Sequence, residues 1–395
     1  MPKLVYIVTV SITADLLLRG QLRTMRDQGF DVTVITSPSA DLDQIAKRED
    51  VQAIAIPMER EINLAKDWWS LWKLYRTLNR LRPDIVNAST PKAGLLGMTA
   101  AWLARIPIRV YVLRGLRLET TAGLQRLILG LAERVTANCA QHIVCVSHSL
   151  LKVYGKLGIT NPEKLSVLGK GTSNGIVIER FLPTSATRKQ ADALRNQLGM
   201  PSDAPVIGFI GRFTRDKGII ELVEAFEQVS VKISTAHLLL VGRFEEGDPV
   251  PERIRKVIET HPRIKQAGWV SDTAPYYHVM NLLAFPSYRE GFPNAPLEAA
   301  VAGIPTIGFS ATGIVDAVQH DKTGFLVPTG AVDKLAAAMI RLLESSDKCK
   351  SMGITAQEWA TQNFAAENVW QNWAAYFHKC IAVQKINPAV QSKIV

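Results

Sequence analysis

The stretch that decides the fold is residues 281–302, NLLAFPSYREGFPNAPLEAAVA. Its apolar start, Asn281 to Pro286, predicts a strand, and Leu297 to Ala302 predicts a helix. Between them stand Glu290 and Glu298, eight residues apart. A strand, a short turn and a helix N-terminus present unpaired backbone N–H groups to an anion, while carboxylates accept hydrogen bonds from sugar hydroxyls. The stretch therefore predicts a site for a ligand that carries both groups, such as a sugar nucleotide. The alternative is an ordinary junction with two solvated glutamates.

A second motif, GFIGRFTRDKG, occupies residues 208–218. The apolar run from Val206 to Ile210 predicts a buried strand, and Gly211 permits a sharp turn after it. Arg212 and Lys217 then follow the carboxyl end of that strand, where open α/β sheets bind ligands. A bidentate guanidinium and a lysine ammonium are a suitable pair for a diphosphate. The alternative is a solvated basic loop.

Together the two motifs resemble the family 4 glycosyltransferases of the GT-B fold, and the resemblance covers almost the whole chain. Asn174-Gly-Ile176, followed by Phe181, also resembles that family's crossing between domains. The resemblance implies an α/β fold with two Rossmann-like, doubly wound domains facing a central cleft. We expect an acceptor-side domain over 1–180, a donor domain over 181–364, and a tail over 365–395 that packs back on the first domain.

The resemblance also implies a role for each matched residue. Glu298 would hold the ribose hydroxyls and Glu290 would contact the donor sugar near the reaction centre, while Arg212 and Lys217 would hold the diphosphate. Pro293 is a departure, because many relatives have a glycine there whose N–H serves the donor. The residues expected to bind the donor are Gly211, Gly291, Phe292, Asn294, Ala295 and Glu298, and those expected to act in catalysis are Glu290, Lys217 and Arg212.

Length and composition agree with a globular protein of two domains. The chain has 395 residues, of which 47% are hydrophobic, and four cysteines that form no metal-like cluster with the seven histidines. Buried thiols in a reducing compartment are the simplest account. The pattern shows no signal peptide and no stretch long enough for a membrane span, which predicts a cytoplasmic or peripheral protein.

The net charge of +10 lies almost entirely in the first half of the chain. Residues 1–170 hold 23 Lys and Arg against 14 Asp and Glu, a net of +9, and the remainder holds a net of +1. Such asymmetry suggests a polyanionic partner: an anionic membrane surface or a lipid pyrophosphate. Nucleic acid is disfavoured because no nucleic-acid motif accompanies the charge. A basic surface kept for solubility is the alternative.

Alternating strands and helices fill both halves, as in a parallel, doubly wound sheet. The tail, from about Ala365 to Val383, is expected to be a helix whose aromatic residues serve packing. A helix is also expected from Leu16 to Gln28, with Asp15 as its N-terminal cap. The expected strands are Leu4–Val10, Asp31–Thr36, Asp84–Ala88, Arg109–Leu113, His142–Val146, Val206–Ile210, His237–Val241, Leu282–Phe285 and Pro305–Phe309.

Two places in the first half are candidates for the acceptor side. Thr90, Lys92 and Gly94 follow a strand and open a helix, so they could receive an anion; this run resembles the subgroup that builds capsule, O-antigen and other surface polysaccharides. Arg114 follows another strand near a position where many relatives have a histidine. It would stabilise departing phosphate or grip the acceptor's pyrophosphate. An ordinary helix start with a solvated lysine is the alternative for the first place, and a surface arginine is the alternative for the second.

Trp68, Trp72 and Tyr75 share one face of a predicted helix, with basic residues nearby. An amphipathic basic and aromatic helix can lie on an anionic membrane, and the same pattern serves a helix packed on its own sheet. The sequence leaves both alternatives open.

The resemblance implies a retaining, metal-independent enzyme that needs no cofactor. It would move a hexose or N-acetylhexosamine from a nucleotide sugar, with UDP as the expected nucleotide, to a lipid-pyrophosphate-linked saccharide at the inner membrane face. A soluble acceptor is one alternative. A nucleotide-sugar epimerase or a non-catalytic binding module is another.

Overall fold

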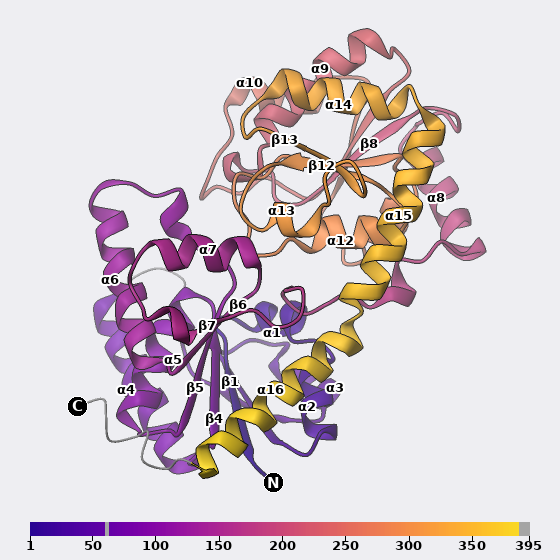
Figure 1. Ribbon diagram of the computed structural model, residues 1–395. Coiled ribbons are helices and arrows are strands. Elements are labelled where there is room, and N and C mark those ends of the chain that lie inside the picture. Colours follow the sequence, from indigo (N-terminus) through magenta and orange to yellow (C-terminus); the bar gives the residue numbers. More distant parts are fainter. Residues whose placement is uncertain (60–62, 387–395) are drawn as a thin grey trace. The chain divides into compact units, whose positions relative to one another are not determined.

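The computed structural model describes residues 1–59 and 63–386, and the chain forms two compact units. Met1–Gly175 and Glu367–Val395 make the first unit, and Ile176–Ala366 makes the second. Each unit is built on a single parallel sheet flanked by helices (Figure 1). The predicted fold class, two Rossmann-like doubly wound α/β domains, is therefore confirmed.

The first unit has a seven-stranded sheet in the order β3-β2-β1-β4-β5-β6-β7. Its central strands are fully buried and mostly apolar, as expected for a parallel sheet covered on both faces. The strands are β1 (Lys3–Ile7), β2 (Asp31–Thr36), β3 (Gln52–Ala55), β4 (Ile85–Ser89), β5 (Ile108–Leu113), β6 (His142–Cys145) and β7 (Leu165–Ser166).

Helices cover both faces of this sheet. Figure 1 draws α4, α5 and α6 along one side of the strands, and α2, α3 and α16 along the other. α5 packs against both α4 and α6. The helices are α1 (Ser11–Leu17), α2 (Gln21–Asp27), α3 (Leu42–Glu49), α4 (Leu64–Leu81), α5 (Pro91–Leu103), α6 (Gly123–Cys139), α7 (His148–Lys156) and α16 (Ala366–Ile386).

The second unit has a six-stranded sheet in the order β10-β9-β8-β11-β12-β13. Its strands are β8 (Val206–Ile210), β9 (His237–Val241), β10 (Ile264–Gly268), β11 (Leu282–Phe285), β12 (Thr306–Phe309) and β13 (Gly324–Val327). Its helices are α8 (Ser185–Gln197), α9 (Ile219–Lys232), α10 (Glu252–Thr260), α11 (Ala274–Tyr277), α12 (Asn294–Val301), α13 (Ile314–Ala317), α14 (Val332–Leu343) and α15 (Ser346–Phe364).

The predicted helix from Leu16 to Gln28 is wrong, because the segment forms two helices. α1 ends at Leu17, and α2 begins at Gln21 after Gly20, whose φ is +76°. The indole of Trp370 fills the space that a Cβ at Gly20 would occupy. Asp15 lies inside α1 and caps nothing, since the N-cap is Val10. Tertiary packing against α16 thus decides where the chain bends.

α16 packs on the first unit as the aromatic spacing predicts. Phe377 and Trp373 are buried, and the Phe377 ring meets the rings of Tyr6 and Phe30 at centroid distances of 6.3 and 6.1 Å. The predicted packing role of these aromatic residues is confirmed.

The chain enters and leaves the second unit at neighbouring points. Ile176 N–H donates to the carbonyl oxygen of Phe364 (2.8 Å), and Ala366 N–H donates to that of Ile176 (2.9 Å). Ile176 and Ala365 form a parallel bridge.

The four cysteines are all buried and free, which confirms the predicted thiols. Within the described ranges, 1–59 and 63–386, no helix has both the length and the apolar composition to cross a membrane.

Candidate functional site

The carboxyl edge of the six-stranded sheet gathers the residues predicted to bind the donor. β8 ends at Ile210, and the N–H of Gly211 donates to the carbonyl oxygen of Val241 at 3.0 Å. A Cβ at Gly242 would overlap the carbonyl oxygen of Gly211. Only glycine therefore allows the loops after β8 and β9 to approach this closely.

Lys217 lies in a single 3₁₀ turn, Arg215–Lys217, that ends at Gly218. Gly218 has a φ of +69°, and a Cβ there would overlap the carbonyl oxygen of Pro286. This close approach brings Lys217 beside the loop that follows β11. Lys217 Nζ lies 2.5 Å from Glu290 Oε1, and both side chains are largely buried. The two motifs, 73 residues apart, thus meet in one ion pair.

Arg212 is half exposed and is held by two carboxylates. Its Nη1 lies 2.6 Å from Glu245 Oε2, and its Nη2 lies 3.8 Å from Asp216 Oδ2. Asp216 also lies 3.4 Å from Arg289 Nη2. Burial raises the pKa of Asp216, but the hydrogen bond from Thr214 and the surrounding cations outweigh it and hold the pKa below its usual value. The loop is thus a cluster of matched charges, with two partners of Arg212 that sequence reasoning did not identify.

The loop that carries Glu290 is fixed by the segment after β12. Glu290 N–H donates to the carbonyl oxygen of Thr312 at 3.0 Å. Gly313 has a φ of +78°, and a Cβ there would lie 2.7 Å from the carbonyl oxygen of Gly291. Phe292 is buried against Phe364, with ring centroids 5.3 Å apart. These contacts hold the Glu290 side chain at the sheet edge.

Asn294 and Ala295 open α12, with Pro293 as the N-cap. No side chain caps this helix terminus, and Asn294 Oδ1 is buried without a hydrogen-bond partner among the described residues. First-turn amides have no intrahelical partner and carry the positive end of the helix dipole. This terminus therefore offers N–H donors to an anionic ligand.

Glu298 lies one turn further along α12 and accepts two hydrogen bonds. Tyr277 Oη donates to its Oε2 at 2.8 Å, and Thr273 Oγ1 donates at 3.4 Å. Burial raises the pKa of Glu298 above its usual value, although the bond from Tyr277 opposes this. The carboxylate is thus oriented and retains capacity to accept hydroxyl donors.

The acceptor-side residues of the first unit lie at the carboxyl edge of its own sheet. Thr90 precedes α5 with a φ of +77°, and its hydroxyl lies 2.6 Å from that of Thr9. Lys92 is buried, with its Nζ 2.5 Å from Asp67 Oδ2 of α4. Gly94 faces Tyr111, whose ring leaves no room for a Cβ. The alternative of a solvated lysine is wrong, because Asp67 already neutralises Lys92.

Arg114 follows β5 and is partly buried. Its Nη1 donates to the carbonyl oxygen of Ser173 at 2.8 Å, while its Nε is buried without a hydrogen-bond partner among the described residues. Burial lowers the pKa of Arg114 to about 10, an effect that nearby Tyr6 opposes. The hydroxyl of Tyr6 is likewise buried and unpartnered in that part of the chain. Two orphaned polar groups thus stand beside this edge.

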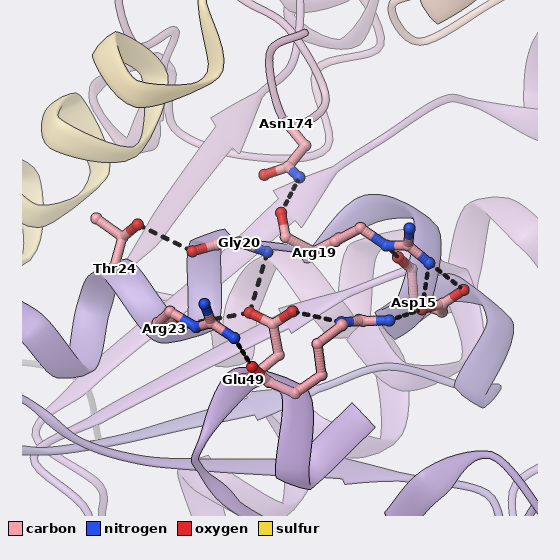
Figure 2. A network of polar contacts seen from close by, with 8 residues as sticks. Asp15, Arg19, Gly20, Arg23, Thr24, Glu49 and Asn174 are labelled. Carbon is pink, nitrogen blue, oxygen red and sulfur yellow. Dashed lines mark hydrogen bonds and ion pairs between the residues drawn. The ribbon is translucent and has the colours of Figure 1, made fainter. Parts of the chain in front are cut away.

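A polar network fills the region of the Ser11–Asp15 segment (Figure 2). The carboxylate of Glu49 accepts from the N–H groups of Gly20 (3.0 Å) and Arg23 (3.3 Å) and so caps α2 from a distance. Asp15 pairs with Arg19 and Arg48. Although burial opposes it, bonding to these two arginines holds the pKa of Asp15 below its usual value. Asn174 Nδ2 donates to the carbonyl oxygen of Arg19 at 3.0 Å, which ties the end of the first unit to this network.

The arrangement suits a ligand with a diphosphate and a sugar. Arg212, Lys217 and Glu290 lie on adjacent loops of one sheet edge, and α12 adds its N-terminus and Glu298 there. Among residues 1–59 and 63–386, no three His, Cys, Asp or Glu side chains gather as a metal site. Sequence reasoning missed Asp216, Glu245, Tyr277 and Gly313. The sequence offers a signal for two of these residues: Asp216 directly precedes Lys217, and Gly313 is a glycine that could allow a close backbone approach.

Comparisons with known proteins agree with this geometry. A family model described as glycosyltransferase family 4 matches residues 18–173, and one described as glycosyl transferases group 1 matches residues 204–345. The capsular polysaccharide biosynthesis glycosyltransferase CapM of Staphylococcus aureus is 33% identical over 377 residues, covering 95% of this chain and 97% of that protein. A UDP-Gal:α-D-GlcNAc-diphosphoundecaprenol α-1,3-galactosyltransferase of Escherichia coli is 26% identical, covering 82% of this chain and 83% of that protein.

Solved structures show the same fold. The structure of HepE from Anabaena in complex with UDP-glucose has a TM-score of 0.80 at 22% identity, covering 96% of this chain and all of that one. Sucrose-phosphate synthase from Thermosynechococcus elongatus has a TM-score of 0.80 at 20% identity, covering 97% of this chain and 100% of that one. Both matches support the GT-B fold.

Proposed function

The chain belongs to the family 4 glycosyltransferases, and from that premise we propose that it transfers a hexose or N-acetylhexosamine from a nucleotide sugar, with UDP as the nucleotide, to a lipid-pyrophosphate-linked saccharide in surface polysaccharide synthesis. The main support for a nucleotide-sugar donor is the ion pair of Lys217 and Glu290 at 2.5 Å, which joins the two motifs at one sheet edge. The names of two relatives support the rest: CapM acts in capsular polysaccharide biosynthesis, and the Escherichia coli enzyme is named for UDP-Gal and a diphosphoundecaprenol acceptor.

In the proposed reaction the bond between the anomeric carbon and the β-phosphate oxygen breaks, and the electron pair stays on that oxygen. Lys217, Arg212 and the first-turn amides of α12 (Asn294 and Ala295) stabilise the developing negative charge electrostatically, without a metal or another cofactor. The acceptor hydroxyl attacks the face from which the diphosphate leaves, and its proton passes to the departing phosphate oxygen. The anomeric configuration is retained.

The two carboxylates, Glu298 and Glu290, have separate roles. Glu298, oriented by Tyr277, accepts the ribose hydroxyls. Glu290 accepts from hydroxyls of the donor sugar and is held near its position by the contacts of Thr312 and Gly313. Lys217 pairs with Glu290, so in the complex its ammonium contacts both that carboxylate and the donor phosphate. The ion pair therefore positions the sugar and the diphosphate of the donor relative to each other.

For the acceptor we propose that Thr90, Lys92, Gly94 and Arg114 line its site. The orphaned Nε of Arg114 supports this assignment, because a pyrophosphate oxygen would give it an acceptor. The lipid part of the acceptor implies action at the inner membrane face.

The test is incubation of the purified protein with radiolabelled UDP-sugars and bacterial membranes, followed by butanol extraction. We expect label in the butanol phase with the native protein and none with Glu290→Ala. Label only in a water-soluble product would support a soluble acceptor. Conversion of the donor without any acceptor would support an epimerase, and donor binding without turnover would support a binding module.

A further inference from the structure

α4 presents three indole rings to solvent. Trp68, Trp69 and Trp72 are 72%, 52% and 40% exposed, and the rings of Trp69 and Trp72 stack at 4.9 Å. The opposite face of the helix makes the core contacts, through Ser70, Leu74 and Leu78. The helix therefore packs on its own unit through this opposite face, while the indole rings of Trp68 and Trp72 stay largely outside that packing.

α6 is exposed in a different way. No residue of its first half, Gly123–Leu131, is buried, although five of these nine residues are leucine or isoleucine. Leu124 is 71% exposed and Leu127 is 60% exposed. The inward face of the helix begins only at Glu133. Leu124, Leu127, Ile128 and Leu131 stand at i, i+3, i+4 and i+7, so they share one helix face that the described residues leave exposed, and such a face indicates an interaction surface.

The two exposed segments lie at the same edge of the sheet. In a parallel sheet the connecting helices run opposite to the strands, so their N-terminal halves lie at the carboxyl edge. α4 and α6 flank α5 on one side of the sheet (Figure 1). Thr90 and Arg114 lie at that same edge, because they directly follow β4 and β5. The exposed apolar residues thus gather beside the loops proposed for the acceptor.

The outward-facing charges on α4 and α6 are positive. The two helices carry six cations and two carboxylates, and both carboxylates turn inward: Asp67 to Lys92, and Glu133 to the hydroxyls of Tyr111 and Tyr154. Lys73 and Arg76 lie over the rings of Trp69 and Trp72, at 5.1 and 4.8 Å from the ring centroids. Glu59, just before α4, pairs with Lys66. The six cations are Lys66, Lys73, Arg76, Arg80, Arg126 and Arg134.

We propose that this surface, the α4–α6 face (Leu64, Trp68, Trp69, Trp72, Leu124, Leu127, Ile128 and Leu131 with the six cations), docks on a bilayer that contains anionic lipid. Indole rings favour the interface between headgroups and acyl chains, leucine side chains enter the acyl region, and cations meet the headgroup phosphates. The inference rests on the proposed function, because docking there brings the acceptor loops to the depth of a lipid-linked pyrophosphate.

The first experiment is flotation of the purified protein with vesicles of phosphatidylcholine, with and without about one-third phosphatidylglycerol. We expect binding to the anionic vesicles and a blue shift of tryptophan fluorescence. The double variant Trp68→Gln, Leu127→Gln should bind roughly tenfold more weakly, because both side chains lose apolar contact with the acyl region. Trp269→Gln is the matched control, since Trp269 is 65% exposed in the second unit. A native protein that stays with the buffer overturns the proposal without any variant.

The second experiment tests the charges. Lys73→Glu and Arg76→Glu should each weaken binding to anionic vesicles by about fivefold or more, and binding should fall as salt rises. Lys256→Glu, an exposed change in the second unit, should leave binding unchanged. Equal loss in all three variants would indicate net charge alone and would contradict a defined face.

Two further measurements separate this inference from the proposed function. Glu290→Ala should lose transfer and keep vesicle binding, whereas the Trp68, Leu127 variant should keep UDP binding and bind vesicles more weakly. Sedimentation in the absence of lipid tests a second copy of the chain as the occupant. A native dimer that the Trp68, Leu127 variant converts to a monomer would overturn the membrane assignment.

Discussion

The two units differ in where they keep their apolar and charged side chains. Among the described residues, the second unit exposes few large apolar side chains, and these are scattered: Val231, Trp269, Val315 and Ile354. The first unit concentrates its exposed tryptophan and leucine residues on α4 and α6, within the half of the chain that carries a net charge of +9.

The two units also differ in how their charges are balanced. At the edge of the second sheet, Arg212, Lys217 and their carboxylate partners form a matched cluster around a helix terminus. A small ligand with a defined charge pattern suits such a cluster, and a broad surface suits the one-sided charge of the first unit. The difference fits the two kinds of recognition proposed above.

Lys217→Ala should give the largest effect, and it tests the matched cluster. The variant loses the ammonium next to the leaving phosphate and leaves Glu290 without its ion-pair partner. We expect turnover to fall by about 10²–10³-fold, measured as initial rate at saturating donor. Lys232→Ala, exposed in the same unit, is the control. Unchanged turnover would remove Lys217 from the site.

Glu133→Gln tests the ionisation of the buried carboxyl group on the inward side of α6. Burial raises the pKa of Glu133 to about 7, although hydrogen bonds from Tyr154 and Tyr111 oppose this. The folded protein therefore binds more protons than the unfolded chain between the usual glutamate pKa and about 7. The free energy of unfolding contributed by this group should fall as pH rises through that window, by about 3 kcal/mol in all.

Urea unfolding at pH 5 and pH 8 measures this contribution as the difference between the native protein and Glu133→Gln. A neutral amide removes the ionisation, so the variant should lack that part of the pH dependence. Parallel curves for the two proteins would show that the Glu133 carboxyl titrates normally in the fold.

Gly313→Ala tests how sharply the Glu290 loop must be placed. A Cβ there would lie 2.7 Å from the carbonyl oxygen of Gly291, so the loop must shift. A displacement of about 1 Å at a positioned group can cost roughly 100-fold in rate. Gly303→Ala is matched, because Gly303 has the same φ of +78° and its Cβ would meet nothing closer than 3.8 Å. Similar rates for both variants would contradict the placement argument.

Glu245→Gln should give the smallest effect. Removing the charge that holds Arg212 at 2.6 Å frees the guanidinium for the diphosphate. Because exposed ion pairs contribute about 0.2–1 kcal/mol, UDP should bind up to about fivefold more tightly, as measured by calorimetry. Weaker binding would mean that Glu245 orients Arg212 for the ligand.

The sequence predicts the buried strands well and the edge strands poorly. The bounds of β2, β8, β9 and β11 agree with the prediction. Apolar runs identify β8, β9 and β11 as buried strands, and β-branched residues identify β2. The edge strands β3, β10 and β13 were missed: β3 and β10 are partly exposed and carry mixed side chains, and β13 is apolar but only four residues long. The two-residue β7 has no pattern to detect.

The candidate site was predictable in its residues but not in its pairings. Glu290 and Lys217 each stand in a local motif, yet only the pairing of β8 with β11 brings them together. Lys92 shows the limit clearly. Its position at a helix start suggests anion binding, and its partner Asp67 lies on a different helix that no local pattern connects to it.

The paired entry and exit of the second unit has a consequence for engineering. Since Ile176 and Ala365 lie side by side as bridge partners, the six-stranded unit is an insertion whose two ends coincide. It could be exchanged as a single cassette for that of another transferase, or closed with a short linker and produced alone. Under the donor site proposed for this unit, donor preference would move with the cassette through two neighbouring peptide junctions.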